Sequence, residues 1–315
     1  MQPKPLFIVN PQSGGGRTRH EFPGLQSVIE QRIGEFDLVW TARAGHGIDL
    51  ARAAAEDERP LVVAVGGDGT LGEIATGLLQ AKATGNVPPE LGFIGQGTGC
   101  DFARGLGIPH EFNAYLERIA SPSRRKLDIG WVRYRAHDGT TKERHFVNIL
   151  SVGLGGLVDR HVETANRQLG GKAAYFLASA RSMLEAKRGK LTLRVVNQGE
   201  ENTRELGSYL IAFCNGTHFG SGMRVAPMAR LDDGRFEVVS LDGSNKFSFL
   251  RAARGIYAGS HLRSPGVTHF SCEGAEVKLE NEEVRDAFLI DCDGDAIGTL
   301  PIEVKMLRNA LTLRA

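Results

Sequence analysis

The stretch Leu61-Val62-Val63-Ala64-Val65-Gly66-Gly67-Asp68-Gly69-Thr70 places five apolar residues directly before a glycine-rich turn. A second stretch repeats this design, with Leu91-Gly92-Phe93-Ile94-Gly95 leading into Gln96-Gly97-Thr98-Gly99-Cys100-Asp101. Each stretch predicts a buried strand, a tight turn and then a helix. Glycines let backbone N–H groups approach phosphate oxygens, and the start of a helix adds the positive end of its dipole. Two such turns, each with an aspartate, therefore indicate a site for a nucleoside triphosphate and its metal ion.

The composition is that of a soluble globular protein. The chain has 315 residues, of which 41% are hydrophobic and 24% charged, and its net charge is +1. Such a charge argues against a dedicated nucleic-acid binder. Four scattered cysteines without a CxxC pair indicate reduced thiols in a cytoplasmic protein. No segment approaches the ~18 consecutive apolar residues of a membrane span, so we expect any membrane contact to be peripheral.

The two halves of the chain follow different patterns. Residues 1–127 alternate short apolar strands with helices, which predicts an α/β domain built on a parallel sheet. Ligands of such sheets bind beyond the carboxyl ends of the strands, where both glycine turns and the loop 10–16 would lie. Residues 128–315 predict a mainly antiparallel β-sandwich whose last strands could pack back on the first domain. The expected strands there are 131–135, 144–149, 191–196, 209–214, 236–241, 275–279, 288–292 and 302–307.

Several local patterns have ordinary structural interpretations. Thr70 and Glu73 fit a capping box, and residues 172–187 predict a helix. The basic groups at 124–126 and 187–190 are interpreted as solvated faces rather than membrane contacts. An apolar pattern in the second half is interpreted as core rather than as a lipid slot, and it comprises Phe247, Phe249, Leu250, Ile256 and Tyr257.

The order of the motifs resembles the diacylglycerol kinase catalytic family, above all its soluble bacterial lipid kinases, which are related to sphingosine kinases. The resemblance rests on Val9-Asn10-Pro11-x-Ser13-Gly14, then on the GGDGT turn at 66–70, and then on Gly97-Thr98-x-x-Asp101-Phe102-Ala103-Arg104. The second half agrees through Asn215-Gly216-x-x-x-Gly220-x-Gly222 and the run 226–234. The aspartates of Asp291-Cys292-Asp293-Gly294-Asp295 stand where the family has a late Asp-Gly-Glu.

The resemblance implies an ATP site between the two domains. The first glycine loop and the GGDGT turn would hold the nucleotide, and Thr41 and Thr98 take the positions of two further contacts. The implied nucleotide-binding residues are Asn10, Ser13, Gly14, Thr41, Gly66, Gly67, Asp68, Gly69, Thr70 and Thr98.

The resemblance also implies catalytic and metal-binding roles. Asp295 falls at the position of the general base that takes the proton from the lipid hydroxyl. Asp128, with Asp68, would belong to the network that organises catalytic Mg²⁺. A structural metal ion would use the Asp233 side chain and the main-chain oxygens of Arg230 and Arg235, and oxygen ligands suit Mg²⁺ or Ca²⁺.

Two residues depart from the family pattern. Cys100 stands where the family usually has asparagine, which puts headgroup recognition or local packing in doubt. Asp295 replaces a glutamate, and the lost methylene draws its carboxylate back by about 1.5 Å. Either the backbone compensates or Asp293 shares the role of base. In another interpretation, the three aspartates of 291–295 form a solvated acidic turn.

We therefore expect an ATP- and Mg²⁺-dependent lipid kinase that acts on a diacylglycerol-like hydroxyl at the inner face of the membrane. One alternative is an NAD kinase, for which the pair Asn281-Glu282 would have to grip the ribose. The other is a catalytically silent protein that binds nucleotide or lipid. Nucleic-acid partners are not expected, and a homodimer is left open.

Overall fold

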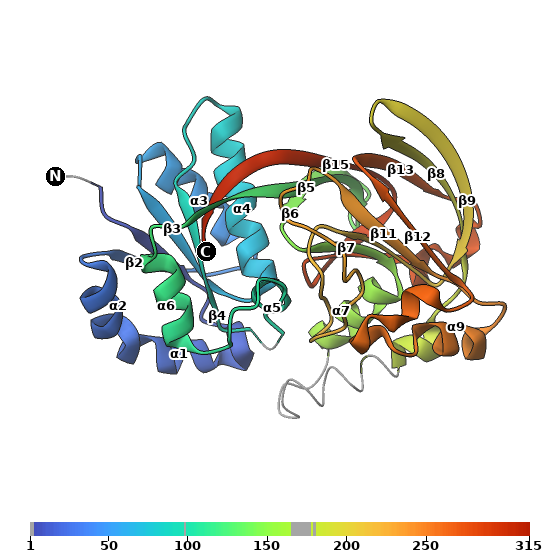
Figure 1. The fold of residues 1–315 in the computed structure, drawn as a ribbon, viewed down its shortest axis with the longest axis horizontal. Coiled ribbons are helices and arrows are strands. Elements are labelled where there is room, and N and C mark those ends of the chain that lie inside the picture. The colour runs from blue at the N-terminus through green and yellow to red at the C-terminus, as the bar shows by residue number, and fades with distance from the viewer. Residues whose placement is uncertain (1–2, 98, 165–177, 179–180) are drawn as a thin grey trace.

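The computed structural model describes residues 3–97, 99–164, 178 and 181–315. These residues form two lobes joined by long strands (Figure 1). Much of the predicted helix at 172–187 lies outside the described residues, although 181–185 are helical. Thr98 also lies outside them.

The N-terminal lobe is a parallel sheet in the order β2-β1-β3-β4, as the strand and helix pattern predicted. Strand β3 is buried along its whole length, which explains its uninterrupted run of apolar residues. Helix α4 follows β3 directly, and the short helix α5 follows β4 after the second glycine turn. The strands are β1 (Leu6–Val9), β2 (Asp37–Trp40), β3 (Leu61–Gly66) and β4 (Glu90–Gly95), and the helices are α1 (Arg17–Glu21), α2 (Gln26–Ile33), α3 (His46–Glu56), α4 (Asp68–Ala83), α5 (Asp101–Gly105) and α6 (Phe112–Ala120).

The C-terminal lobe is mostly antiparallel, which confirms the predicted change of pattern. Two of its strands, β9 and β12, were not predicted, and the predicted strand 144–149 is divided between β6 and β7. The strands are β5 (Arg124–Ala136), β6 (Thr141–Phe146), β7 (Ile149–Gly153), β8 (Gly189–Asn197), β9 (Glu200–Ser208), β10 (Leu210–Cys214), β11 (Phe236–Leu241), β12 (Val267–Cys272), β13 (Gly274–Leu279), β14 (Leu289–Cys292) and β15 (Asp295–Arg314); the helices are α7 (Leu154–Thr164) and α9 (Lys246–Ala253).

Strands β5 and β15 connect the lobes. They pair with each other along most of their length, and near its end β15 also pairs in parallel with β4 at Leu313 and Leu91. The same β15 begins at Asp295, in the hairpin that it forms with β14. One strand therefore runs from a predicted catalytic residue into the sheet of the other lobe (Figure 1). The boundary predicted at residue 127 falls inside β5.

The predicted capping box at the start of α4 is wrong. The helix begins at Asp68, so Thr70 lies inside its first turn and no side chain caps it. The Glu73 carboxylate instead accepts hydrogen bonds from the N–H groups of Gly45 at 2.7 Å and Gly47 at 3.0 Å. Glu73 thereby fixes the turn that opens α3.

Candidate active site

The two glycine turns lie in backbone contact at the carboxyl edge of the parallel sheet. Gln96 N donates a hydrogen bond to Gly66 O at 2.8 Å, and a Cβ atom on Gly97 would lie 2.8 Å from Gly67 Cα. The first loop reaches the same place, since a Cβ atom on Gly14 would lie 2.7 Å from Gln96 O. Only residues without side chains allow these three segments to approach so closely.

The loop after β1 contains three consecutive residues with unusual backbone conformations. Gly14, Gly15 and Gly16 have φ angles of 61°, 71° and 91°, which most other residues adopt only under strain. Ser13 is buried, and its Oγ atom has no hydrogen-bond partner in the part of the chain that the structure describes. An unpaired buried hydroxyl is costly unless a ligand satisfies it. The loop is therefore consistent with a site that a nucleotide completes.

The remaining predicted nucleotide contacts lie along the same edge. Asn10 follows β1, and its Nδ2 atom donates to Thr70 Oγ1 at 3.0 Å. Thr41 follows β2 and is held by a hydrogen bond from its N–H to Val9 O at 2.9 Å. The fold thus gathers residues that are distant in the chain.

Asp68, the first residue of α4, joins the two glycine turns. Its carboxylate accepts hydrogen bonds from the N–H groups of Asp101 at 2.9 Å and Phe102 at 3.3 Å, at the start of α5. Burial, together with the neighbouring Asp101 carboxylate, raises the pKa of Asp68 to about 7. A cation beside Asp68 would relieve this cost of ionisation.

Asp101 ties this edge to the C-terminal lobe. Its carboxylate accepts a hydrogen bond from Ser221 N at 2.7 Å and forms an ion pair with Arg104. Ser221 lies in a tight turn with a φ angle of 64°, between Gly220 and Gly222, which also have positive φ angles. The predicted DFAR motif is therefore a contact between lobes as well as the start of a helix.

The acidic hairpin between β14 and β15 is not a solvated turn, so that interpretation is wrong. Asp293 and Gly294 form its two-residue tip with φ angles of 52° and 92°, as a tight hairpin requires. Asp293 is only 7% exposed and accepts hydrogen bonds from the N–H groups of Val147, Asn148 and Ile149 at 2.7 to 3.0 Å. Burial, with a contribution from Asp68, raises the pKa of Asp293 to about 7.

Asp295 is the accessible member of the hairpin, with a side chain that is 42% exposed. Its Oδ2 atom accepts a hydrogen bond from Arg144 Nη2 at 2.5 Å. A Cβ atom on Gly69 would lie 3.2 Å from each carboxylate oxygen, so Asp295 faces the first turn of α4. Arg144 was not predicted as a site residue, and its charge keeps the Asp295 carboxylate in place.

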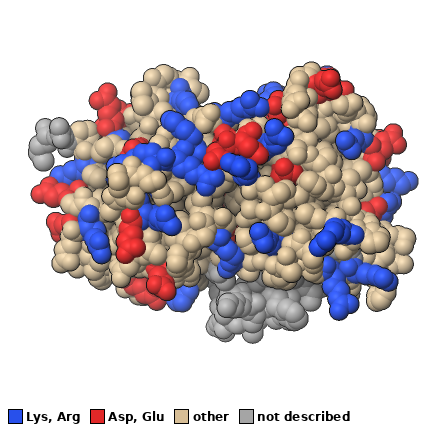
Figure 2. Space-filling model, viewed as in Figure 1, with Lys and Arg blue, Asp and Glu red and all other residues tan. Residues whose placement is uncertain are grey.

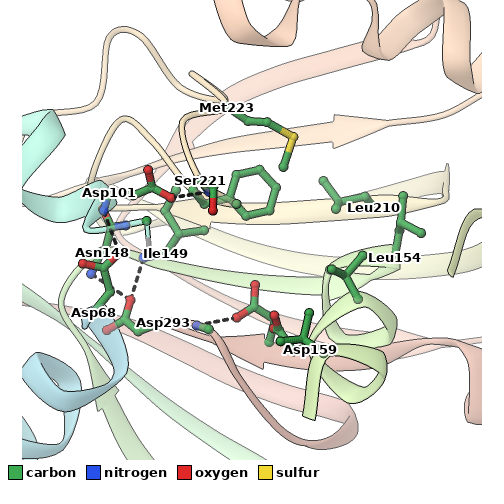
Figure 3. Close-up of a pocket in the computed structure, with 18 of the residues that line it drawn as sticks. Asp68, Asp101, Asn148, Ile149, Leu154, Asp159, Leu210, Ser221, Met223 and Asp293 are labelled. Atoms are coloured by element: carbon green, nitrogen blue, oxygen red, sulfur yellow. Dashed lines mark hydrogen bonds between the residues drawn. The ribbon is translucent and has the colours of Figure 1, made fainter. Parts of the chain in front are cut away.

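A cavity of about 860 Å³ extends from these carboxylates into the C-terminal lobe. Figure 3 shows Asp68, Asp101 and Asp293 on the left and Leu154 and Leu210 on the right, with Met223 above and Asp159 below the space between them. The interpretation of the 247–257 pattern as core is wrong in part. Phe249, Ile256 and Tyr257 line the cavity, whereas Phe247 and Leu250 are exposed. The cavity is acidic at the glycine turns and apolar beyond them.

Asp128 lies apart from this cavity. It is buried, and its two carboxylate oxygens accept hydrogen bonds from Gly234 N and Asn309 N, both at 2.6 Å. Asp128 thus supports the turn 230–235, where Asp233 accepts a weaker hydrogen bond from Arg235 N at 3.3 Å. The roles implied for Asp128 and for the structural metal site of Arg230, Asp233 and Arg235 stay predictions.

The raised pKa of Asp293 predicts a pH-dependent stability. Its native pKa of about 7 exceeds the ordinary value of 3.8, so its contribution is fully present below the ordinary value and is lost as the pH rises through 7. In urea unfolding with EDTA present, we expect the ionisation of Asp293 to lower the free energy of unfolding by roughly 2–3 kcal/mol between about pH 5 and about pH 8. Asp293→Asn should flatten that dependence, although it lowers stability overall because one acceptor is lost. The exposed Asp57→Asn is the control, and an unchanged slope in Asp293→Asn would contradict the assignment.

Comparison with known proteins places the chain in a family. The model of the diacylglycerol kinase catalytic domain matches residues 4–132, and that of the YegS C-terminal NAD kinase beta sandwich-like domain matches residues 148–315. The chain belongs to the diacylglycerol kinase-like lipid kinases, with a catalytic domain followed by a YegS-type C-terminal domain. The catalytic domain implies the use of ATP.

Individual relatives agree with this assignment. The chain is 28% identical to a diacylglycerol kinase of Bacillus subtilis over 298 residues, 94% of this chain and 91% of that protein. It is 33% identical over 205 residues to a Chromohalobacter salexigens protein named "Probable lipid kinase YegS-like", a match that covers 63% of this chain and 59% of the relative. A crystal structure of a diacylglycerol kinase from Bacillus anthracis shares the fold, with a TM-score of 0.70, 19% identity and coverage of 99% and 96% of the two chains.

Proposed function

We propose that this protein transfers the γ-phosphate of ATP to a hydroxyl group of a diacylglycerol-like lipid, with Mg²⁺ as the metal ion. The observation that carries the proposal is that one continuous cavity joins the glycine turns and Asp295 to an apolar interior. A nucleotide alone has no need of the apolar part, and a lipid alone has no need of the glycine turns. The carboxylates lie where the two substrates would meet.

The residues divide the work of phosphoryl transfer. The N–H groups of the glycine turns and the start of α4 would hold the phosphates of ATP, with Asn10 and Ser13 closing the first loop. Asp295, accessible and oriented by Arg144, would accept the proton of the lipid hydroxyl. Asp293 would act as a positioning residue, because its carboxylate is already engaged by three N–H groups.

The residues present fit a magnesium ion carried by the nucleotide. In proteins Mg²⁺ usually keeps several waters and binds one or two carboxylates plus substrate phosphates. Within the described residues no three histidine, cysteine or acidic side chains converge on one point, but Asp68 offers one desolvated carboxylate beside the turns. Asp68 would hold the ion, which when bound offsets the charge that develops on the transferred group.

The NAD kinase alternative receives no support from the site. Asn281 Oδ1 accepts a hydrogen bond from Lys190 N at 2.6 Å, and its Nδ2 atom donates to Arg188 O at 3.1 Å. Asn281 therefore anchors the start of β8, and neither Asn281 nor Glu282 lines the cavity. The catalytically silent alternative remains for experiment to exclude.

The test is the transfer of labelled γ-phosphate from ATP to lipid alcohols in mixed micelles. We expect label in diacylglycerol and its loss when EDTA removes the metal ion, because the phosphate charge is then uncompensated. Sphingoid bases, phosphatidylglycerol and prenol-like alcohols test the choice of acceptor, and NAD is the water-soluble control. Label in NAD alone, or measurable ATP binding without transfer to any acceptor, would overturn the proposal.

A further inference from the structure

Most exposed large hydrophobic side chains in the described part of the chain belong to the C-terminal lobe and lie in or near the wall of the cavity. In the described ranges there are six, and only Val87 belongs to the N-terminal lobe. Val162 and Tyr257 line the cavity itself. Phe247 and Leu250 flank the cavity-lining Phe249 on α9. Leu184 is the sixth exposed hydrophobic side chain. Exposed apolar side chains that cluster in this way mark an interaction surface.

The members of this cluster are neighbours. Lys246 Nζ donates a hydrogen bond to Leu184 O, which joins the start of α9 to the segment after residue 181. Phe247 and Leu250 are three residues apart on α9 and share its outer side, while Phe249 points inward and is 2% exposed. Phe247 is 78% exposed and Leu250 50%. We call Leu184, Phe247, Leu250, Tyr257, Arg251 and Arg254 the docking face.

The charge on the α9 side of the docking face has one sign. Residues 243–272 contain four cationic side chains and no aspartate or glutamate. Arg251, Arg254 and Arg263 are exposed, and none forms an ion pair with a carboxylate of the described residues. In Figure 2, Lys and Arg side chains gather at the lower right, over the position of α9, among tan rather than red atoms.

The basic run at 124–126 behaves differently, in agreement with its interpretation as an ordinary surface. Arg124 pairs with Glu90, Arg125 pairs with Asp232, and Lys126 donates to Thr312 Oγ1. Arg124 and Arg125, whose charges are already neutralised by carboxylates, attract a membrane only weakly. Arg251 and Arg254, which form no ion pair within the described residues, are therefore the better candidates for contact with anionic lipid.

We propose that the docking face binds the surface of an anionic phospholipid bilayer and holds the mouth of the cavity against it. Arg251 and Arg254 would contact the headgroups, and Phe247, Leu250 and Leu184 would insert among the upper acyl chains. A lipid acceptor could then pass from the bilayer into the apolar end of the cavity without crossing water. The role given to the docking face, delivery of a lipid acceptor, rests on the proposed function. Binding to a bilayer can nevertheless be measured without ATP or acceptor.

The experiment is sedimentation of the whole protein with vesicles of phosphatidylcholine, alone or mixed with equal parts of phosphatidylglycerol. We expect the wild type to bind the anionic vesicles, and added salt to weaken that binding. Arg251→Gln/Arg254→Gln should bind them about 30-fold more weakly, since each of the two cations near an anionic surface contributes about fivefold. Phe247→Ser/Leu250→Ser should lose at least about 10-fold, because the inserted apolar area is removed.

Matched controls come from the other lobe. Arg32→Gln/Arg118→Gln removes two exposed helical arginines from α2 and α6, and Val87→Ser removes the one exposed large apolar side chain among the described residues of that lobe. Neither change should alter vesicle binding. Equal binding of wild type and docking-face variants, or no preference of the wild type for anionic vesicles, would overturn the proposal.

A second measurement separates this inference from the proposed function. Phosphorylation of a short-chain diacylglycerol dispersed in water needs no bilayer, so the docking-face variants should keep the wild-type rate. Loss of that rate in the variants would place these residues in the active site and overturn the docking role. If the wild type phosphorylates no acceptor at all, the proposed function fails while vesicle binding still decides the docking face.

Discussion

Asp295→Asn is expected to lower kcat for lipid phosphorylation by about 10²–10⁴, the range that removal of a general base usually produces. The substitution keeps the size of the side chain and its contact with the first turn of α4, but it removes the atom that accepts the proton. Because the Asp295 carboxylate accepts its hydrogen bond from Arg144 and not from the N–H groups of the glycine turns, KM for ATP should change little. The measurement is steady-state transfer of labelled phosphate at saturating ATP and acceptor.

Two comparisons make this result specific. Asp57→Asn removes an exposed carboxylate at the end of α3 and should leave kcat unchanged. Asp293→Asn tests the other candidate base in the same hairpin, and we expect it to affect stability more than proton transfer. If Asp295→Asn kept more than about a tenth of the activity while Asp293→Asn lost it, the role of base would belong to Asp293.

Gly97→Ala is expected to reduce transfer about 100-fold, because an added methyl group forces the two glycine turns apart. Its Cβ atom would lie 2.8 Å from Gly67 Cα, a backbone atom that cannot move aside as a flexible side chain can. Gly97 does not have a positive φ angle, so the effect comes from contact rather than from backbone strain. The displacement would disturb the phosphate-binding N–H groups, so KM for ATP should rise as kcat falls.

Gly24→Ala provides the matched control for this substitution. A Cβ atom at Gly24 meets no atom within 4 Å, and its φ angle is not positive. Activity and melting temperature should both stay at the wild-type level in this variant. Wild-type kinetics in Gly97→Ala would show that the turns tolerate separation and that the close contact has no part in nucleotide binding.

The sequence predicted the parallel sheet well because its strands are buried on both faces. Strands β3 and β4 are therefore short apolar runs between clear turns. Strand β9 was missed because its first six residues are exposed and polar and pair only with β8 at the rim of the C-terminal lobe. It forms a hairpin with the preceding strand β8 through the two-residue turn Gln198-Gly199, whose φ angles are 53° and 80°, so the turn rather than an apolar pattern is its local signal.

The candidate site was predictable where it follows local motifs and not where it depends on distant pairing. The GGDGT turn and Asp101 could be placed from glycine spacing alone. The contact of Arg144 with Asp295 could not, because it requires strands β6 and β15 to be brought together from positions 151 residues apart. The division of the 247–257 pattern between cavity and surface depends in the same way on how α9 sits against the sheet.

Under the proposed function, the irregular pairing of β5 with β15 bears on how acceptors are selected. The register shifts between Leu307 and Leu311, where Asn309 has a φ angle of 49° and its N–H is held by Asp128. This bulge lies where the two strands pass from one lobe to the other, and bulges set the local bend of a strand. We expect substitutions at this joint to change the angle between the lobes while leaving the side chains of Asp68 and Asp295 in place. Sequence changes at this bulge in related enzymes would thus alter the width of the cleft between the lobes, and with it the size of the acceptor that fits.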